Sequence, residues 1–184
     1  RRAYLAGALV RVLPGVYARP GVDARVAALA QRDPQAVLVG RAAAALTWWP
    51  NLPVPLVRAI RSGGGPHRDA QGFAWVRRPV PDQHIERCGG IWLTDAATTA
   101  LDLIPELGGR AIDEALRRRA VRLVDLESTL RDLPRQRGNT ERRRLLADSR
   151  DEPWSEAERL FHRILRGLRL AWPYQTNHLV MMAT

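Results

Sequence analysis

A chain of 184 residues, 46% of them hydrophobic, can form one main domain with short flanking pieces. No apolar run approaches the roughly 20 residues that span a bilayer, which excludes a membrane-spanning helix, and the single cysteine, Cys88, excludes an internal disulfide. The formal net charge of +10, carried by 29 arginines and no lysine, indicates a polyanionic ligand or an acidic partner protein. A GC-rich genome could equally explain arginine in place of lysine, but not the excess of charge. We therefore expect a cytoplasmic protein that associates with nucleic acid.

The first predicted element is a β-hairpin over residues 8–18. Two short β-prone runs flank the tight-turn sequence Leu13-Pro14-Gly15. The arginines around this hairpin are suited to contact a phosphate backbone, and they are Arg1, Arg2, Arg11 and Arg19. A hairpin with scattered arginines is also a common solvated edge, so both interpretations stay open.

Two helices and a small sheet are predicted next. Asp23 can cap a helix that ends near Arg32, and an alanine-rich helix is expected over residues 40–48. Four short β-prone runs predict strands at residues 56–60, 73–77, 83–86 and 91–93. The glycine-rich residues 62–66 are interpreted as a hairpin turn between the first two of these strands.

Four helices are predicted in the second half of the chain. They cover residues 94–108, 110–118, 123–133 and 139–147, and the first opens on a capping residue and closes on a glycine. Basic side chains gather near the ends of these helices and predict a surface for nucleic acid or for an acidic partner: Arg117, Arg118, Arg122, Arg142 and Arg143. The alternative is that these arginines complement helix dipoles or simply face solvent.

Catalytic and metal-binding patterns are weak. His67, His84, His162 and His178 are far apart and have no metal-ligand spacing, so we predict structural or solvated roles for them and neither a metal site nor a cofactor. Adjacent Trp48 and Trp49 favour core packing over an interface.

Glu158 fits a capping box that Ser155 opens. Its alternative role is that of an acidic metal ligand in a nuclease, but the other ligands that this would need are absent. We therefore expect no complete catalytic site in this chain.

The order of these features resembles AbiEi-type antitoxins, the DNA-binding partners in type IV toxin–antitoxin systems. Residues 9–18 are similar to the wing of that family's winged helix-turn-helix, and residues 36–46 to its first helical block. Residues 93–103 with 111–118 are similar to its most recognisable stretch. The resemblance implies a DNA-binding transcriptional regulator or antitoxin, with a cognate toxin as a possible partner and no membrane.

The C-terminal residues 155–160 look like the opening helix of very-short-patch-repair endonucleases. The resemblance thus implies a wing remnant at residues 1–20, an antitoxin-like α+β domain at 21–150 and an incomplete nuclease-like segment at 151–184. The expected fold class is α+β and mainly helical, with a small mixed sheet and a helical bundle. Two alternatives remain: a metal-dependent endonuclease whose catalytic part lies beyond this chain, or a protein-binding module.

Overall fold

The computed structural model describes residues 10–13, 16–18, 22–61, 72–133 and 137–150, with isolated positions at 164 and 167. Within these residues the fold is α+β and mainly helical, as the sequence predicts. The strands are β1 (Val10–Leu13), β2 (Val16–Ala18), β3 (Val37–Val39), β4 (Val57–Ile60), β5 (Phe73–Val76), β6 (Ile85–Cys88) and β7 (Ile91–Thr94). The helices are α2 (Val22–Arg32), α3 (Arg41–Thr47), α4 (Ala96–Leu107), α5 (Gly109–Arg117), α6 (Leu123–Asp132) and α7 (Asn139–Ala147), with a short 3-10 turn at Asp82–His84.

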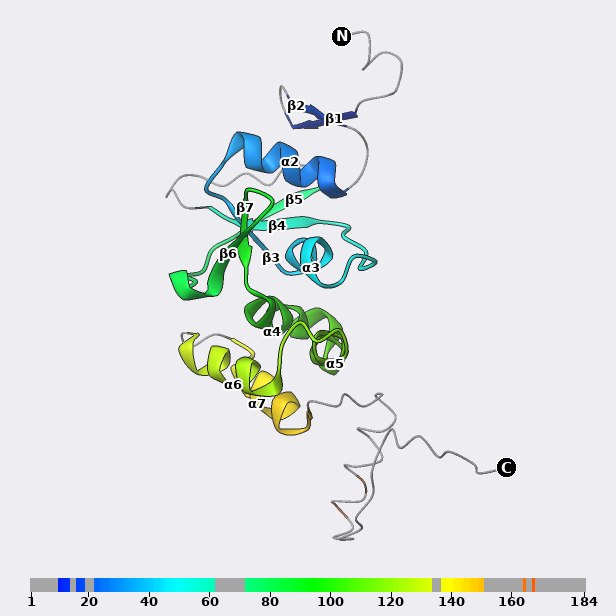
Figure 1. Ribbon diagram of the computed structural model, residues 1–184, viewed down its shortest axis with the longest axis vertical. Helices are drawn as coiled ribbons and strands as arrows, with labels where there is room; N and C mark the ends of the chain where they lie inside the picture. Colours follow the sequence, from blue (N-terminus) through cyan, green and yellow to red (C-terminus); the bar gives the residue numbers. More distant parts are fainter. Residues whose placement is uncertain are drawn as a thin grey trace, which may run out of the picture.

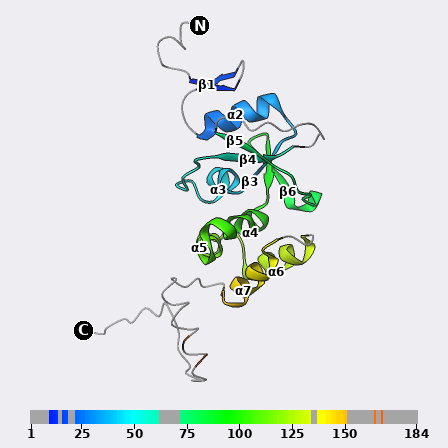
Figure 2. The same ribbon diagram turned by 180° about the vertical axis from the view of Figure 1, so that it is seen from behind.

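The expected N-terminal hairpin is confirmed, since β1 and β2 pair antiparallel. The elements then succeed one another along the molecule: hairpin, α2, the sheet with α3, the α4–α5 pair and the α6–α7 pair (Figures 1 and 2). The hairpin and the α6–α7 pair therefore lie toward opposite ends of the described molecule.

The main sheet has the strand order β5-β4-β3-β7-β6 and is mixed. Its central strand β3 pairs antiparallel with β4 and parallel with β7. Strand β3 is not among the predicted elements, because residues 36–46 were interpreted as a helical block. Three residues, Val-Leu-Val, are too few to show strand periodicity, and only pairing on both sides makes them a strand.

The connection between β4 and β5 corrects a second prediction. These strands are parallel, with Val57 opposite Phe73 and Ile60 opposite Val76. A hairpin joins antiparallel strands, so β4 and β5 are not the two strands of a hairpin; residues 62–66 themselves lie outside the described residues. The strand expected at residues 83–86 is also shifted, because the 3-10 turn delays β6 to Ile85.

Two apolar cores hold the molecule together. The first lies where α2 and α3 cover one face of the sheet, around Leu38, Val57 and Leu93. The second joins α3 to the four C-terminal helices, around Leu101 and other leucine, isoleucine and alanine side chains. Because α3 contributes to both cores, it fixes the sheet against the helical half of the chain.

The start and end of α4 follow the predicted signals. Oδ1 of Asp95 accepts a hydrogen bond of 2.7 Å from the backbone N–H of Thr98, which caps the helix. Gly108 ends α4 with a φ of 57°, a conformation that costs glycine little. In the described part of the chain, no helix is long and apolar enough to cross a membrane.

Candidate nucleic-acid interface

The C-terminal end of α5 brings Arg117 and Arg118 together, as the sequence predicts. Arg117 Nη1 lies 2.6 Å from Oε1 of Glu114, and Arg118 Nε lies 3.0 Å from its Oε2. Two guanidinium groups therefore share one carboxylate, and the exposed Arg119 follows them. This end of the helix keeps a net positive charge, which suits an anionic ligand.

Two arginines on α5 also flank the ring of Trp49. The guanidinium carbons of Arg110 and Arg118 lie 5.5 and 5.7 Å from the ring centroid. Trp49 is only 4% exposed, and Trp48 stacks on it with centroids 5.7 Å apart. The tryptophan pair thus packs in the core, as favoured from the sequence, and the Trp49 ring contacts the guanidinium groups of both arginines. Sequence reasoning missed Arg110, although its spacing of eight residues from Arg118 places both on one helix face.

Arg142 does not belong to the predicted basic surface, because its side chain is buried. It is 5% exposed, and its Nε donates a hydrogen bond of 3.0 Å to the backbone oxygen of Leu101 in α4. That carbonyl would normally accept from the N–H four residues later, but the residue there is Pro105, which has none. Arg142 thus supplies the donor that Pro105 lacks, and its hydrogen bond links α7 to α4.

The remaining members of the predicted basic surface belong to α7 and to the start of α6. Arg122 precedes α6 and pairs with Asp125, with Nη2 and Oδ1 3.0 Å apart. Arg143 is exposed on α7 and lines a groove between α6 and α7. The five helical arginines therefore do not form one patch.

The hairpin arginines are only partly covered by the structure. Arg11 lies in β1, in register with Tyr17 of β2. The other predicted hairpin residues and the candidate nuclease residue lie outside the described residues: Arg1, Arg2, Arg19 and Glu158. Their proposed roles stay predictions.

A cluster not foreseen from the sequence lies where α3, β4 and α4 meet. Glu106 accepts a hydrogen bond of 2.7 Å from Arg41 Nε and binds Arg58 as well. Burial alone would raise the pKa of Glu106, but the two guanidinium groups outweigh it, so this pKa lies below its usual range. The cluster holds two surface arginines with one carboxylate, in the same way as Glu114 does on α5.

A buried carboxylate lies deeper, in the middle of α4. Asp102 pairs with Arg78, and both side chains are nearly covered. Burial raises the pKa of Asp102 to about 6, although the positive charges of Arg78 and Arg142 oppose the shift. The carboxylate of Asp102 therefore has a structural role, because the surrounding chain leaves it little access to a ligand.

His84 joins three elements and has a structural role, as predicted. Its Nδ1 lies 2.9 Å from Oδ2 of Asp95 at the start of α4, and its Nε2 lies 3.4 Å from Oδ2 of Asp132 at the end of α6. The second contact has ion-pair distance without hydrogen-bond geometry. Among the described residues, no three His, Cys, Asp or Glu side chains are placed to hold a metal ion. The other three histidines, at positions 67, 162 and 178, lie outside the described residues.

Comparison with known proteins adds no identification: no protein-family model, curated protein or solved structure matches this chain.

Proposed function

We propose that this chain is a DNA-binding transcriptional regulator of the antitoxin type, acting in the cytoplasm. The observation that carries the proposal is the β1–β2 hairpin, which lies at one end of the molecule and leads into α2 (Figure 1). Arg11 occupies a strand position in this hairpin, where a wing would follow a phosphate backbone. The resemblance of residues 9–18 to an antitoxin wing supports the same conclusion.

The charge distribution supports a polyanionic ligand. The chain carries 29 basic and 19 acidic residues, and Glu106, Glu114 and Asp125 in its described part are each engaged by arginine. Within the part of the chain that the structure describes, exposed Arg87 and Arg110 contact tryptophan rings and pair with no carboxylate. Such guanidinium groups are available to phosphate oxygens, which they bind through paired N–H donors.

The test compares two duplexes and two neutralised arginines. The chain is titrated by fluorescence anisotropy against its own promoter fragment and a scrambled duplex, each at two salt concentrations. We expect tighter binding to the promoter and weaker binding by Arg11→Gln, with the slope of log affinity against log salt reduced by about one. The matched control is Arg137→Gln, which removes the same charge just before α7, at the far end of the molecule from the hairpin.

Two outcomes contradict the proposal. Equal affinity for the two duplexes would leave only a nonspecific basic surface. Equal effects of the two substitutions would show that net charge, and not the hairpin, determines binding. The cognate toxin is part of the same proposal, and co-purification of the product of the neighbouring gene tests it separately.

A further inference from the structure

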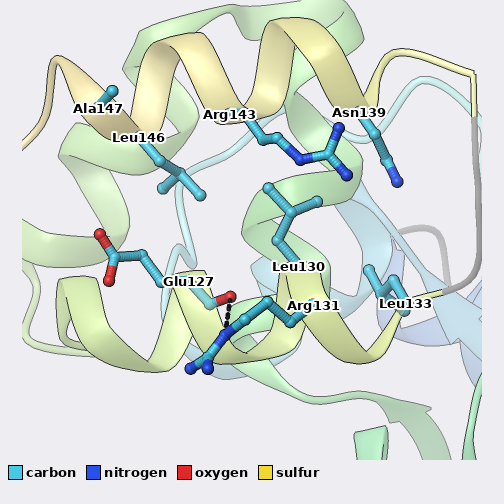
Figure 3. A pocket seen from close by; sticks show the side chains of 8 residues that line it. All are labelled: Glu127, Leu130, Arg131, Leu133, Asn139, Arg143, Leu146 and Ala147. Atoms are coloured by element: carbon cyan, nitrogen blue, oxygen red, sulfur yellow. Dashed lines mark hydrogen bonds between the residues drawn. The ribbon is translucent and has the colours of Figure 1, made fainter.

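A groove of about 570 Å³ lies between α6 and α7, and the leucines that line it belong to the second apolar core. Glu127 lies opposite Leu146 and Ala147, and Leu133 lies opposite Asn139, so the two helices line the groove antiparallel (Figure 3). Leucine side chains of both helices form its base, and charged side chains form its rim. Two antiparallel helices with an open groove between them can accept a third helix, as in a small bundle.

Two arginines lie on the groove, and Nε of one of them, Arg131, donates a hydrogen bond of 3.4 Å to the backbone oxygen of Glu127 (Figure 3). Elsewhere on α6 and α7 the charged groups are paired: Asp125 with Arg122, Arg144 with Glu141 and Asp148, and Asp132 with His84. On the groove, the described residues provide no carboxylate partner for the exposed guanidinium groups of Arg131 and Arg143. Among the described residues that line the groove, Glu127 is the one carboxylate against two arginines, so their summed charge is positive.

The two ends of the groove differ. At one end, the guanidinium of Arg143 extends toward Asn139 (Figure 3). Oδ1 of the buried Asn139 accepts a hydrogen bond of 2.8 Å from Arg142. The exposed guanidinium of Arg143 makes this end suited to a carboxylate. At the other end, Glu127 reaches toward Leu146 (Figure 3).

An exposed apolar side chain extends the groove beyond Glu127. Val124 is 52% exposed, and it lies one turn before Glu127 on the same side of α6. A valine at this position adds apolar contact area for a segment longer than the groove itself.

From these observations we propose that the α6–α7 groove docks an acidic amphipathic helix of a partner protein. Its apolar residues would pack against exposed Val124 and Ala147 and over the edges of Leu130 and Leu146, which are 6% and 4% exposed. Its carboxylates would bind Arg131 and Arg143. A positively charged helix is disfavoured, because it would face two guanidinium groups with one carboxylate to compensate. The inference is independent of DNA binding, since it concerns the opposite end of the molecule.

The experiment selects helices from a displayed library against the full chain. Each library member is a 16-residue helix with leucine at helical spacing, and its flanking positions are randomised among Glu, Gln and Lys. We expect the recovered helices to be enriched in Glu and to bind Arg143→Glu at least about fivefold more weakly than the original chain. Ala147→Trp, which fills the groove from an exposed position, is expected to abolish binding.

The matched control is Arg32→Glu, an equal charge reversal on exposed α2, which is expected to bind the recovered helices unchanged. Circular dichroism and the urea midpoint verify that each variant is folded; if Ala147→Trp is not, Ala147→Arg takes its place. Recovery of no helix, enrichment of Lys, or full binding by the filled groove would overturn the proposal. So would a result in which Arg143→Glu weakens only duplex DNA binding, because the groove arginine would then serve nucleic acid.

Discussion

Replacing Arg142 with methionine tests how α7 is attached to α4. The substitution keeps an unbranched side chain of moderate length but removes the guanidinium that donates to the oxygens of Leu101, Asn139 and Arg137 at 3.0, 2.8 and 3.3 Å. The Leu101 oxygen then has no donor, since Pro105 cannot supply one. A reversible unfolding transition in urea measures the cost.

The magnitude follows from the partners left behind. A buried acceptor without a donor costs about 1–3 kcal/mol, and the hydrogen bond to Asn139 contributes about 1.5 kcal/mol or more because the donor is charged. Removing the buried positive charge recovers part of this loss, since burying a guanidinium is itself unfavourable. We therefore expect Arg142→Met to lower the free energy of unfolding by about 3 kcal/mol.

The proline provides the decisive comparison. In Pro105→Ala, residue 105 regains a backbone N–H that can donate to the Leu101 oxygen, so the carbonyl no longer depends on Arg142. The loss on replacing Arg142 is then expected to shrink by about 1–2 kcal/mol in the alanine background. If the two substitutions are additive to within about 0.3 kcal/mol, Arg142 does not compensate for the proline and the reasoning is wrong.

Three further predictions concern the buried polar groups and the tryptophan core. Because burial raises the pKa of Asp102 to about 6 from 3.8, the folded state binds a proton that the unfolded state releases, so its stabilising contribution is complete below pH 4 and is lost as pH rises through 6. Urea unfolding at pH 4.5 and 7 should show the wild type losing about 2 kcal/mol relative to Asp102→Asn, and a constant difference would contradict the assigned pKa. His84→Ala should lower the free energy of unfolding by about 1–2 kcal/mol and speed amide hydrogen exchange in the last turn of α6, where Asp132 loses its partner. Unchanged exchange would mean that the contact does not stabilise this turn. Trp49→Leu should cost about 2–4 kcal/mol in thermal or urea unfolding, because it leaves a cavity and removes the ring that two arginines share, whereas a loss below 1 kcal/mol would show that the ring is not core.

Features determined by local sequence were predictable, and the structure places them where expected. The Asp95 cap, the glycine after α4 and the limits of α7 all depend on residues within a few positions of one another. The end of α2 at Arg32 is likewise confirmed, and Val26 and Leu29 of this helix are at most 4% exposed. Such signals depend on backbone groups within one or two turns, so tertiary contacts seldom override them.

Features that depend on distant pairing were not predictable in the same way. Strand β3 forms because β4 and β7 pair with it on both sides. Its three residues alone do not indicate that pairing. Arg142 is next to two exposed arginines in the sequence, and only α4, 41 residues away, determines which of the three is buried. The predicted basic surface differs from the observed one for the same reason. A run of charges in the sequence shows how many arginines a helix carries, but not which of them form an ion pair with a carboxylate.

The distinction between paired and unpaired charge also separates the two proposed interfaces. Around Glu114, Glu106 and Asp125 each carboxylate is engaged by arginine, so an anionic ligand there must compete with an existing pair or use the arginine excess. On the α6–α7 groove, the guanidinium groups have no such competitor among the described residues, and leucine lies between them. DNA offers phosphate but no apolar side chain to pack against the leucines of the groove, whereas an acidic amphipathic helix offers both carboxylate and leucine. A ligand that combines charge with apolar surface should therefore prefer the groove.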